Sequence, residues 1–173
     1  MTANEQEAIF LGWLKNHAGI IFKVVRGSAG TPQDHDDLLQ EVLLQLWLSV
    51  PSFRGEAQAT TWIYRVAFNT ALAWRRGERR QREGYERFVK LELPSAMPSN
   101  RHAVPENDLI ERLYAHIRAL PKVDASLALM HLDGRSYEEM AEVLGISENY
   151  VGVKLNRIRN KLAEQLKGMV HEF

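Results

Sequence analysis

The strongest chemical signal in this sequence is a helical segment near the C-terminus that is rich in basic and amide side chains. Its inward stripe is formed by Val151, Leu155, Ile158 and Leu162, which recur at helical spacing. The polar side chains that face away from this stripe are Asn149, Lys154, Asn156 and Arg157. Amide, ammonium and guanidinium groups can bond adenine and guanine edges in the major groove of DNA. The segment therefore predicts a DNA-recognition helix, and a merely solvated charged surface is the alternative.

A helix-turn-helix would position this segment. Ser136 is placed to cap a first helix, and Glu139 follows three residues later to complete a capping box. Gly145 stands where a sharp turn needs a left-handed backbone, and Ser147 is placed to cap the second helix. Residues 134–162 therefore predict two helices that meet at a turn, with a helix pair that only packs as the alternative.

A second stretch, between residues 53 and 82, places aromatic side chains beside basic ones. Phe53 and Arg54 precede a loop, and the helix after it carries Trp62, Asn69 and Trp74. The arginines of that helix are Arg65, Arg75, Arg76, Arg79, Arg80 and Arg82. Rings that stack on nucleobases, next to cations that hold the backbone, are what binding of unstacked DNA requires. Burial of both tryptophans in a core explains the composition equally well.

Composition limits the classes of function. The chain has 173 residues, a formal net charge of zero and no cysteine, so disulfides and thiolate metal sites are excluded. The histidines are scattered and no catalytic constellation is visible, so we expect no metal, no cofactor and no enzymatic activity. The sequence lacks a signal-peptide pattern, and no apolar run approaches the roughly 20 residues of a membrane span. We therefore expect a cytoplasmic protein without membrane insertion.

Helical periodicity runs through almost the whole chain. Residues 5–26 carry apolar side chains at helical intervals, with a break allowed near Gly19, and Thr31-Pro32 is typical of a helix start. Another helix is expected to begin at Thr60 or Thr61. The expected fold is all-α, with two small helical domains joined by a flexible linker. Proline and serine content places the linker at residues 84–105, between one domain at residues 1–83 and a second at residues 106–173.

Two segments of the chain together resemble a known family. Residues 36–76, which begin DDLLQEV and end ALAWRR, resemble region two of sigma-70-family transcription factors, especially the small extracytoplasmic-function (ECF) group. Residues 120–162, which include GRSYEEMAEVLGISENYVGVKL, resemble region four of the same group. Their order and the short linker also match. The resemblance implies a non-catalytic sigma factor that binds core RNA polymerase, directs it to promoter DNA and helps to melt that DNA.

The resemblance also implies roles for individual residues. Recognition of the minus-ten element would involve Phe53, Arg54, Gln58, Thr61, Trp62, Arg65, Asn69, Arg75 and Arg76. The minus-thirty-five groove would receive Ser147, Asn149, Tyr150, Val153, Lys154, Asn156, Arg157 and Arg159. Docking on the coiled coil of the polymerase β′ subunit would involve Asp37, Leu38, Gln40, Glu41, Leu44 and Trp47. Region four would also hold the polymerase β flap, and the group implies an anti-sigma factor as a further partner.

One place departs from the family's pattern. Gly152 and Val153 stand where many members carry a basic and a hydroxyl residue. A methyl surface that could contact thymine thus replaces a polar partner, which leaves the minus-thirty-five preference open. Two other hypotheses also remain open. They are a helix-turn-helix transcription regulator that binds duplex DNA without polymerase, and a degenerate sigma-like interaction module.

Overall fold

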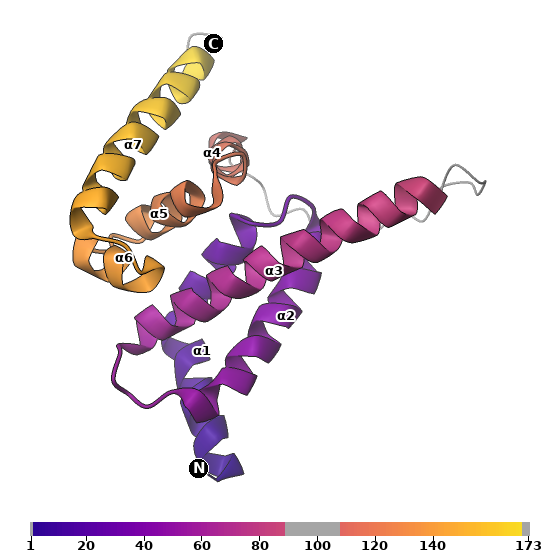
Figure 1. Cartoon of the computed structure of the whole chain (residues 1–173), viewed down its shortest axis with the longest axis vertical. Coiled ribbons are helices and arrows are strands. Elements are labelled where there is room, and N and C mark those ends of the chain that lie inside the picture. Colours follow the sequence, from indigo (N-terminus) through magenta and orange to yellow (C-terminus); the bar gives the residue numbers. More distant parts are fainter. Residues whose placement is uncertain (1, 89–107, 171–173) are drawn as a thin grey trace.

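The computed structural model describes residues 2–88 and 108–170, with side chains for 2–77 and 109–167. These residues form an all-α fold, as expected, without a strand in the described ranges. The N-terminal group consists of α1 (Ala3–Arg26), α2 (Pro32–Ser49), the short 3-10 helix η1 (Val50–Ser52) and α3 (Ala59–Phe88). The C-terminal group consists of α4 (Asp108–Arg118), α5 (Lys122–Leu132), α6 (Tyr137–Leu144) and α7 (Glu148–Val170), as Figure 1 shows.

Capping side chains fix where the first two helices begin. Thr2 forms a capping box with Glu5 at the start of α1. At the start of α2, the Thr31 hydroxyl accepts a hydrogen bond from the Asp34 amide at 3.1 Å, and Pro32 occupies the first turn. The expected start of α2 at Thr31-Pro32 is therefore confirmed.

Helix α1 is continuous, so the break allowed near Gly19 does not occur. Its buried side chains are Trp13, Ile20, Ile21, Val24 and Val25, which keep helical spacing on both sides of that glycine. By length and composition alone α1 would qualify as a membrane span, contrary to the expectation from the sequence. Its five buried residues pack in the core that α1 forms with α2 and α3, whereas Leu11 and Phe22 are exposed.

The N-terminal core lies where α1 and α2 both pack on α3. The side chains fully buried there include Val24, Leu38, Val42, Leu46, Ile63 and Ala67. Helix α3 continues to Phe88, so the first residues of the segment 84–105 are helical. The remainder of that segment lies outside the described residues.

The helix-turn-helix forms as the sequence predicts. Ser136 and Glu139 make the capping box of α6, and Gly145 has the left-handed φ of 66° at its end. The Ser147 hydroxyl then accepts a hydrogen bond from the Tyr150 amide at 3.2 Å, which caps α7. The inward stripe of α7 is confirmed, since Val151, Leu155 and Ile158 are buried and Leu162 is half-buried.

Replacing Gly145 by alanine is expected to destabilise the helix-turn-helix by about 1–2 kcal/mol, because a Cβ disfavours left-handed backbone. Gly152→Ala is the matched control. Gly152 lies inside α7, where an added Cβ would meet the Tyr137 ring at an ordinary 3.5 Å. We expect this control to be neutral or to gain up to about 1 kcal/mol of helix propensity. Chemical denaturation followed by circular dichroism measures both changes, and equal effects would contradict the assignment.

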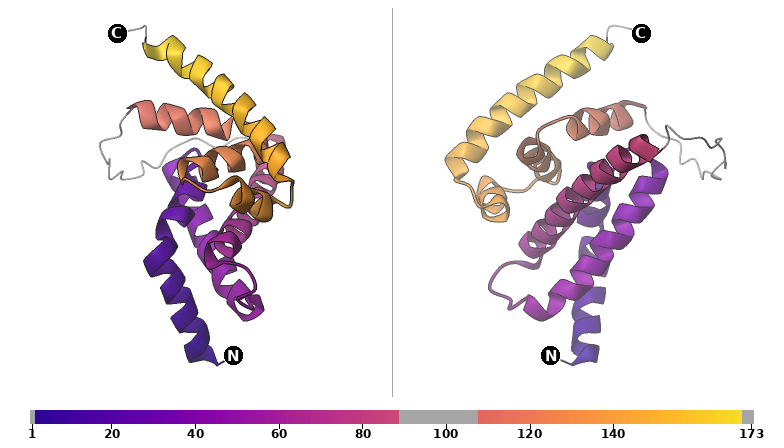
Figure 2. Two further views of the ribbon diagram at one scale, coloured as in Figure 1. Left: turned by 90° about the vertical axis from the view of Figure 1, so that its left-hand side faces the viewer. Right: turned by 45° about the vertical axis from the view of Figure 1, so that its right-hand side comes forward.

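The two groups of helices pack against each other. Helix α6 contacts α3, and α5 contacts α1. Figure 2 shows α5 and α6 next to the N-terminal group, whereas α7 extends away from it. The buried side chains of both groups form one contiguous core cluster.

Candidate nucleic-acid interface

The outward face of α7 carries a row of exposed side chains suited to the major groove. Asn149, Val153, Asn156 and Asn160 are exposed and follow one another at helical spacing, with exposed Arg157 beside them. Val153 is 45% exposed, so its methyl groups are available to a thymine methyl. Asn160 is absent from the residues predicted above, although it continues the same row one turn further along the helix.

Lys154 is held against the protein. Its Nζ lies 2.9 Å from Asp124 Oδ1 on α5 and 5.6 Å from the centre of the Tyr150 ring. The hydrogen bond to Asp124 raises the pKa of Lys154, with burial as an opposing effect. This side chain therefore ties the start of α7 to α5, whereas Arg157 and Arg159 are exposed.

The loop before α3 is anchored by aromatic side chains. The Phe53 ring makes edge-to-face contacts with Trp13 at 5.2 Å and with Trp62 at 5.6 Å between ring centroids. The Trp62 indole N–H donates a hydrogen bond to the Ser49 hydroxyl at 3.0 Å. Phe53 is thus part of an aromatic cluster that closes one end of the N-terminal core, and the exposed loop begins at Arg54.

The predicted minus-ten residues differ in accessibility. Asn69 and Arg76 on α3 are exposed, as are the loop residues Arg54 and Gln58, while Arg65 and Arg75 are half-buried. Thr61 is only 2% exposed, which corrects its prediction as a contact residue, because its side chain lies in the core beneath the start of α3. Arg79, Arg80 and Arg82 fall outside the described side chains.

Asn69 lines a groove between α2 and α3. The groove has a volume of about 510 Å³, and its other walls are formed by Glu41, Gln45, Thr70, Ala73 and Trp74. A predicted minus-ten residue and a predicted polymerase-binding residue, Glu41, therefore share one depression. The Gln45 amide donates to the Glu41 carboxylate at 2.9 Å, which fixes the acidic wall of the groove.

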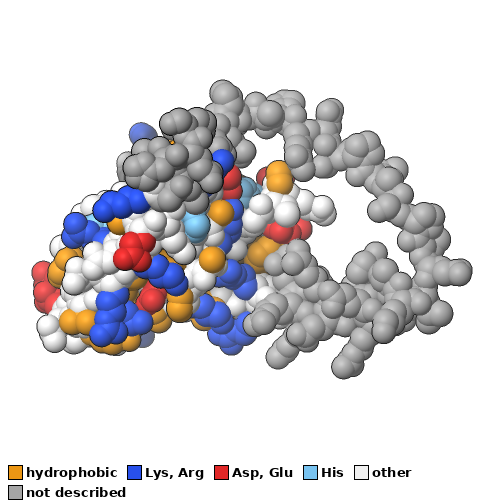
Figure 3. All heavy atoms as spheres, turned by 90° about the horizontal axis from the view of Figure 1, so that it is seen from above, with side chains coloured by type: hydrophobic (Ala, Val, Ile, Leu, Met, Phe, Trp, Pro, Cys, Tyr) orange, Lys and Arg blue, Asp and Glu red, His pale blue; other side chains and the backbone are white. Residues whose placement is uncertain are grey.

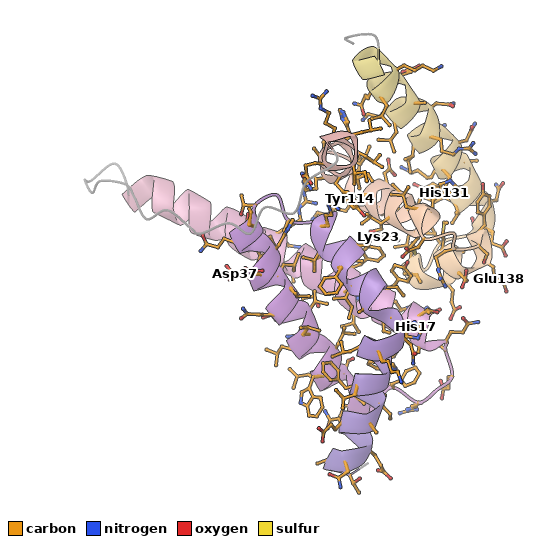
Figure 4. The ribbon with its side chains drawn as sticks, turned by 180° about the vertical axis from the view of Figure 1, so that it is seen from behind. His17, Lys23, Asp37, Tyr114, His131 and Glu138 are labelled. Atoms are coloured by element: carbon orange, nitrogen blue, oxygen red, sulfur yellow. The ribbon has the colours of Figure 1, made fainter. Side chains whose placement is uncertain are left out.

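Helix α2 presents a mixed acidic and apolar face to solvent. Asp37, Gln40 and Leu44 are exposed, and Leu44 shows 50% of its surface. In Figure 4, Asp37 lies on the side of the molecule away from the C-terminal helices. Leu38 is fully buried, which corrects its prediction as a polymerase contact, because it faces the core of the N-terminal group. Trp47 is half-buried against Phe10, with ring centroids 5.4 Å apart.

Charges of both signs are mixed on the described surface. Seen from the end of the molecule in Figure 3, Lys and Arg side chains gather in several groups with Asp and Glu among them. Among the described residues, no cluster of three or more His, Asp or Glu side chains could hold a metal ion.

Asp133, directly after α5, joins the two groups of helices. Its carboxylate accepts a hydrogen bond from the Tyr64 hydroxyl of α3 and forms an ion pair with Lys23 of α1. Figure 4 shows Lys23 where α1 meets the C-terminal helices. Burial, opposed by the charge of Arg135 and reinforced by that of Glu139, raises the pKa of Tyr64 to about 12. Sequence reasoning missed this contact, because no local pattern links residues 69 positions apart.

Because the pKa of the Tyr64 hydroxyl is raised, we expect the protein to lose stability in strong base. Its folded pKa lies above the ordinary 10.0, so its stabilising effect is complete below pH 10 and is lost as the pH rises through about 12. Absorbance of tyrosinate near 295 nm should show one tyrosine that ionises after the others and together with unfolding. Tyr64→Phe should remove that late phase, and a late phase that persists in the variant would assign it to another tyrosine.

Comparison with known proteins places this architecture in a family. Residues 13–81 match the family model of sigma-70 region 2, and residues 110–162 match that of sigma-70 region 4. The RNA polymerase sigma factor SigZ of Bacillus subtilis is 31% identical over 140 residues, which cover 79% of this chain and 74% of that protein. The ECF RNA polymerase sigma-E factor of Escherichia coli K12 is 26% identical over 145 residues, which cover 79% and 76%.

The chain belongs to the sigma-70 family of RNA polymerase sigma factors, in its extracytoplasmic-function group. It is thus a promoter-recognising sigma factor, in a class of non-enzymatic regulators of transcription.

Two solved structures share the fold. CnrH in complex with the cytosolic domain of CnrY matches with a TM-score of 0.66 and 19% identity over 94% of this chain and 90% of that one. The sigma factor RpoE of Bartonella quintana, in complex with the anti-sigma factor NepR, matches with a TM-score of 0.67 and 18% identity over 91% and 96%.

Proposed function

We propose that this chain binds core RNA polymerase through α2, the minus-ten element through α3 and its preceding loop, and the minus-thirty-five element through α7. The polymerase supplies the chemistry, and the chain acts in the cytoplasm where that enzyme works. The observation that carries the proposal is the exposure of three separate faces, one on each of these helices, within a sigma-type fold.

The minus-thirty-five role rests on the outer row of α7. Asparagine side chains can pair with adenine and Arg157 with guanine, while Val153 offers an apolar contact to thymine. The short capped α6 and the Gly145 turn hold this row away from the core. A duplex contact by a helix of this kind needs the major groove, because only that groove admits a helix.

The minus-ten role rests on the Arg54–Gln58 loop and on Asn69. The Phe53–Trp62 contact holds one end of this loop, and the left-handed Gly55, with φ of 75°, turns it outward. Extrusion of a nucleobase costs a few kcal/mol of stacking, which contacts to this loop and to α3 would offset. Arg76, which is exposed on α3, would hold a phosphate of the opened strand.

Two protein partners are included in the proposal. The β′ coiled coil of polymerase would cover the Asp37–Leu44 face of α2, and the β flap would contact the C-terminal group. An anti-sigma factor is the second partner, since the two solved structures of the same fold both carry a bound partner and RpoE is bound to an anti-sigma factor.

Run-off transcription tests the proposal. Purified chain is added to core polymerase on a genomic promoter library, and the start sites of the transcripts are mapped. We expect transcripts that share two sequence elements and that require the chain. Tight duplex binding without polymerase and no dependent transcript would instead support a conventional helix-turn-helix regulator.

A further inference from the structure

A small cavity lies where the N-terminal group of helices meets α5. It has a volume of about 140 Å³ and is lined by α3 and α5, by the turn after α1 and by the end of α6. An apolar cavity of about 150 Å³ inside a protein can hold one benzene molecule. The space is therefore sufficient for one small ring, and it is too small for a nucleotide or a peptide.

The inner wall of this cavity is apolar. Ala71 of α3 and Ala125 and Leu129 of α5 line it and are at most 6% exposed. Phe68 and Leu72 of α3 are half-buried and complete the wall. Burial of apolar surface is favourable roughly in proportion to its area, so this wall favours the apolar part of a ligand.

The outer rim of the cavity is cationic. Exposed Lys122 of α5 and half-buried Arg75 of α3 both line it, and none of the described lining residues is an Asp or a Glu. Arg75 donates one hydrogen bond to the Arg118 carbonyl at 3.1 Å, and a guanidinium has five N–H donors. Neither cation forms an ion pair with a described residue. An anion at this rim would thus meet two positive charges without a competing carboxylate.

Uncharged donors and the start of a helix strengthen the preference for an anion. The residues that line the cavity include Ser28 and Ser126, with hydroxyl groups, and Asn69, with an amide. Helix α5 begins there without a side-chain cap, so the partial positive charge of its N-terminus adds to that of the cations. Asp124 supplies a carboxylate to this first turn, but Lys154 of α7 pairs with it at 2.9 Å. The carboxylate nearest along the chain is therefore already neutralised.

We propose that the cavity binds a small apolar anion, of which an aromatic carboxylate is the simplest example. The ring would lie against Ala71 and Leu129, and the carboxylate would meet Arg75 and Lys122. A neutral ring would leave the cations without a partner, and a wholly polar anion would leave the apolar wall uncovered. Such a ligand is distinct from promoter DNA and from polymerase, although Asn69 and Arg75 also belong to the proposed minus-ten face.

Isothermal titration calorimetry of the free full-length chain tests the proposal with three probes. Benzoate carries both a ring and a charge, benzamide is a neutral molecule of the same shape, and acetate carries the charge without the ring. We expect benzoate to bind with a dissociation constant on the order of 0.1–1 mM, as a ligand of this size permits. Benzamide should bind about tenfold more weakly, because charge-assisted hydrogen bonds are about twice as strong as neutral ones. Acetate should show no binding in the same concentration range.

Two variants locate the site. Ser126→Leu fills the cavity and should abolish benzoate binding, and Arg75→Gln removes a rim cation and should weaken it about tenfold. The matched controls are Ala163→Leu and Arg76→Gln, because both residues are exposed and neither lines the cavity. Both controls should bind benzoate within about twofold of the wild type. Circular dichroism verifies that each variant keeps its helices, and if Ser126→Leu does not fold, Arg75→Gln and its control decide the outcome alone.

Benzoate binding that exceeds benzamide binding, and that only the cavity variants lose, supports the proposal. The proposal is overturned if the wild-type chain binds neither probe at millimolar concentration or binds both equally, or if the folded cavity variants bind benzoate like their controls. No measurement involves polymerase or DNA, so the result is independent of the proposed function, which run-off transcription tests separately.

Discussion

Leu44→Asp is expected to abolish promoter-dependent transcription by preventing binding to core polymerase. Leu44 exposes half of its surface on the face of α2 proposed to dock on the β′ coiled coil. Loss of its burial on docking costs about 1–2 kcal/mol, and an unpaired carboxylate at the interface adds about 1–3 kcal/mol. Together these changes weaken binding about 30-fold or more. Competition for core polymerase against a labelled wild-type chain measures the loss.

Leu11→Asp is the control for this experiment. Leu11 is a similarly exposed leucine, at 54%, but it lies on α1 and outside the proposed docking face. It should leave binding within about twofold, because an isolated surface substitution usually changes free energies by less than 0.5 kcal/mol. Equal losses in both variants would mean that α2 is not the docking face. Normal polymerase binding by Leu44→Asp would reject that assignment directly.

Local chemistry made the helix-turn-helix predictable in detail. The Ser136–Glu139 capping box, the Gly145 turn and the buried stripe of α7 each depend on residues within a few positions of one another. The start of α2 at Thr31-Pro32 is predictable for the same reason. These signals are properties of the backbone and of helical spacing, so the fold class and the local elements could be inferred without any tertiary information.

Contacts between distant segments could not be predicted in this way. The meeting of Lys23, Tyr64 and Asp133 depends on how two groups of helices dock. The pairing of Lys154 with Asp124 likewise depends on the crossing of α5 and α7. The resemblance to the family placed contact roles on whole segments, and it could not separate buried members from exposed ones.

Leu38 and Thr61 show this limit most clearly. Both lie among residues that the resemblance associates with binding, and both are turned into the core. On a helix, neighbouring positions in sequence point in different directions, so a functional segment always includes residues that only support it. The structure makes that separation, and it removes Leu38 from the proposed polymerase face of α2, which keeps Asp37, Gln40, Glu41, Leu44 and the half-buried Trp47.

Arg157→Ala is expected to remove most of the preference for the minus-thirty-five element. Arg157 is exposed on α7 beside the outward asparagine row, and a bidentate contact to guanine is worth about 1–3 kcal/mol of discrimination. The ratio of affinities for an intact and a scrambled element should therefore fall about 5- to 150-fold. Anisotropy of holoenzyme with duplex promoter, at one fixed salt concentration, gives this ratio.

Lys161→Ala separates base recognition from phosphate binding in the same assay. Lys161 is also an exposed cation of α7, and it lies one helical turn beyond Arg157, further from Gly145. If it contacts phosphate, its loss should weaken binding to intact and scrambled elements equally and lower the salt slope by about 1. In Arg157→Ala the phosphate contacts made by other side chains remain, so the salt dependence of binding should keep its slope. An unchanged affinity ratio in Arg157→Ala would show that the asparagine row and Val153, rather than this arginine, read the element.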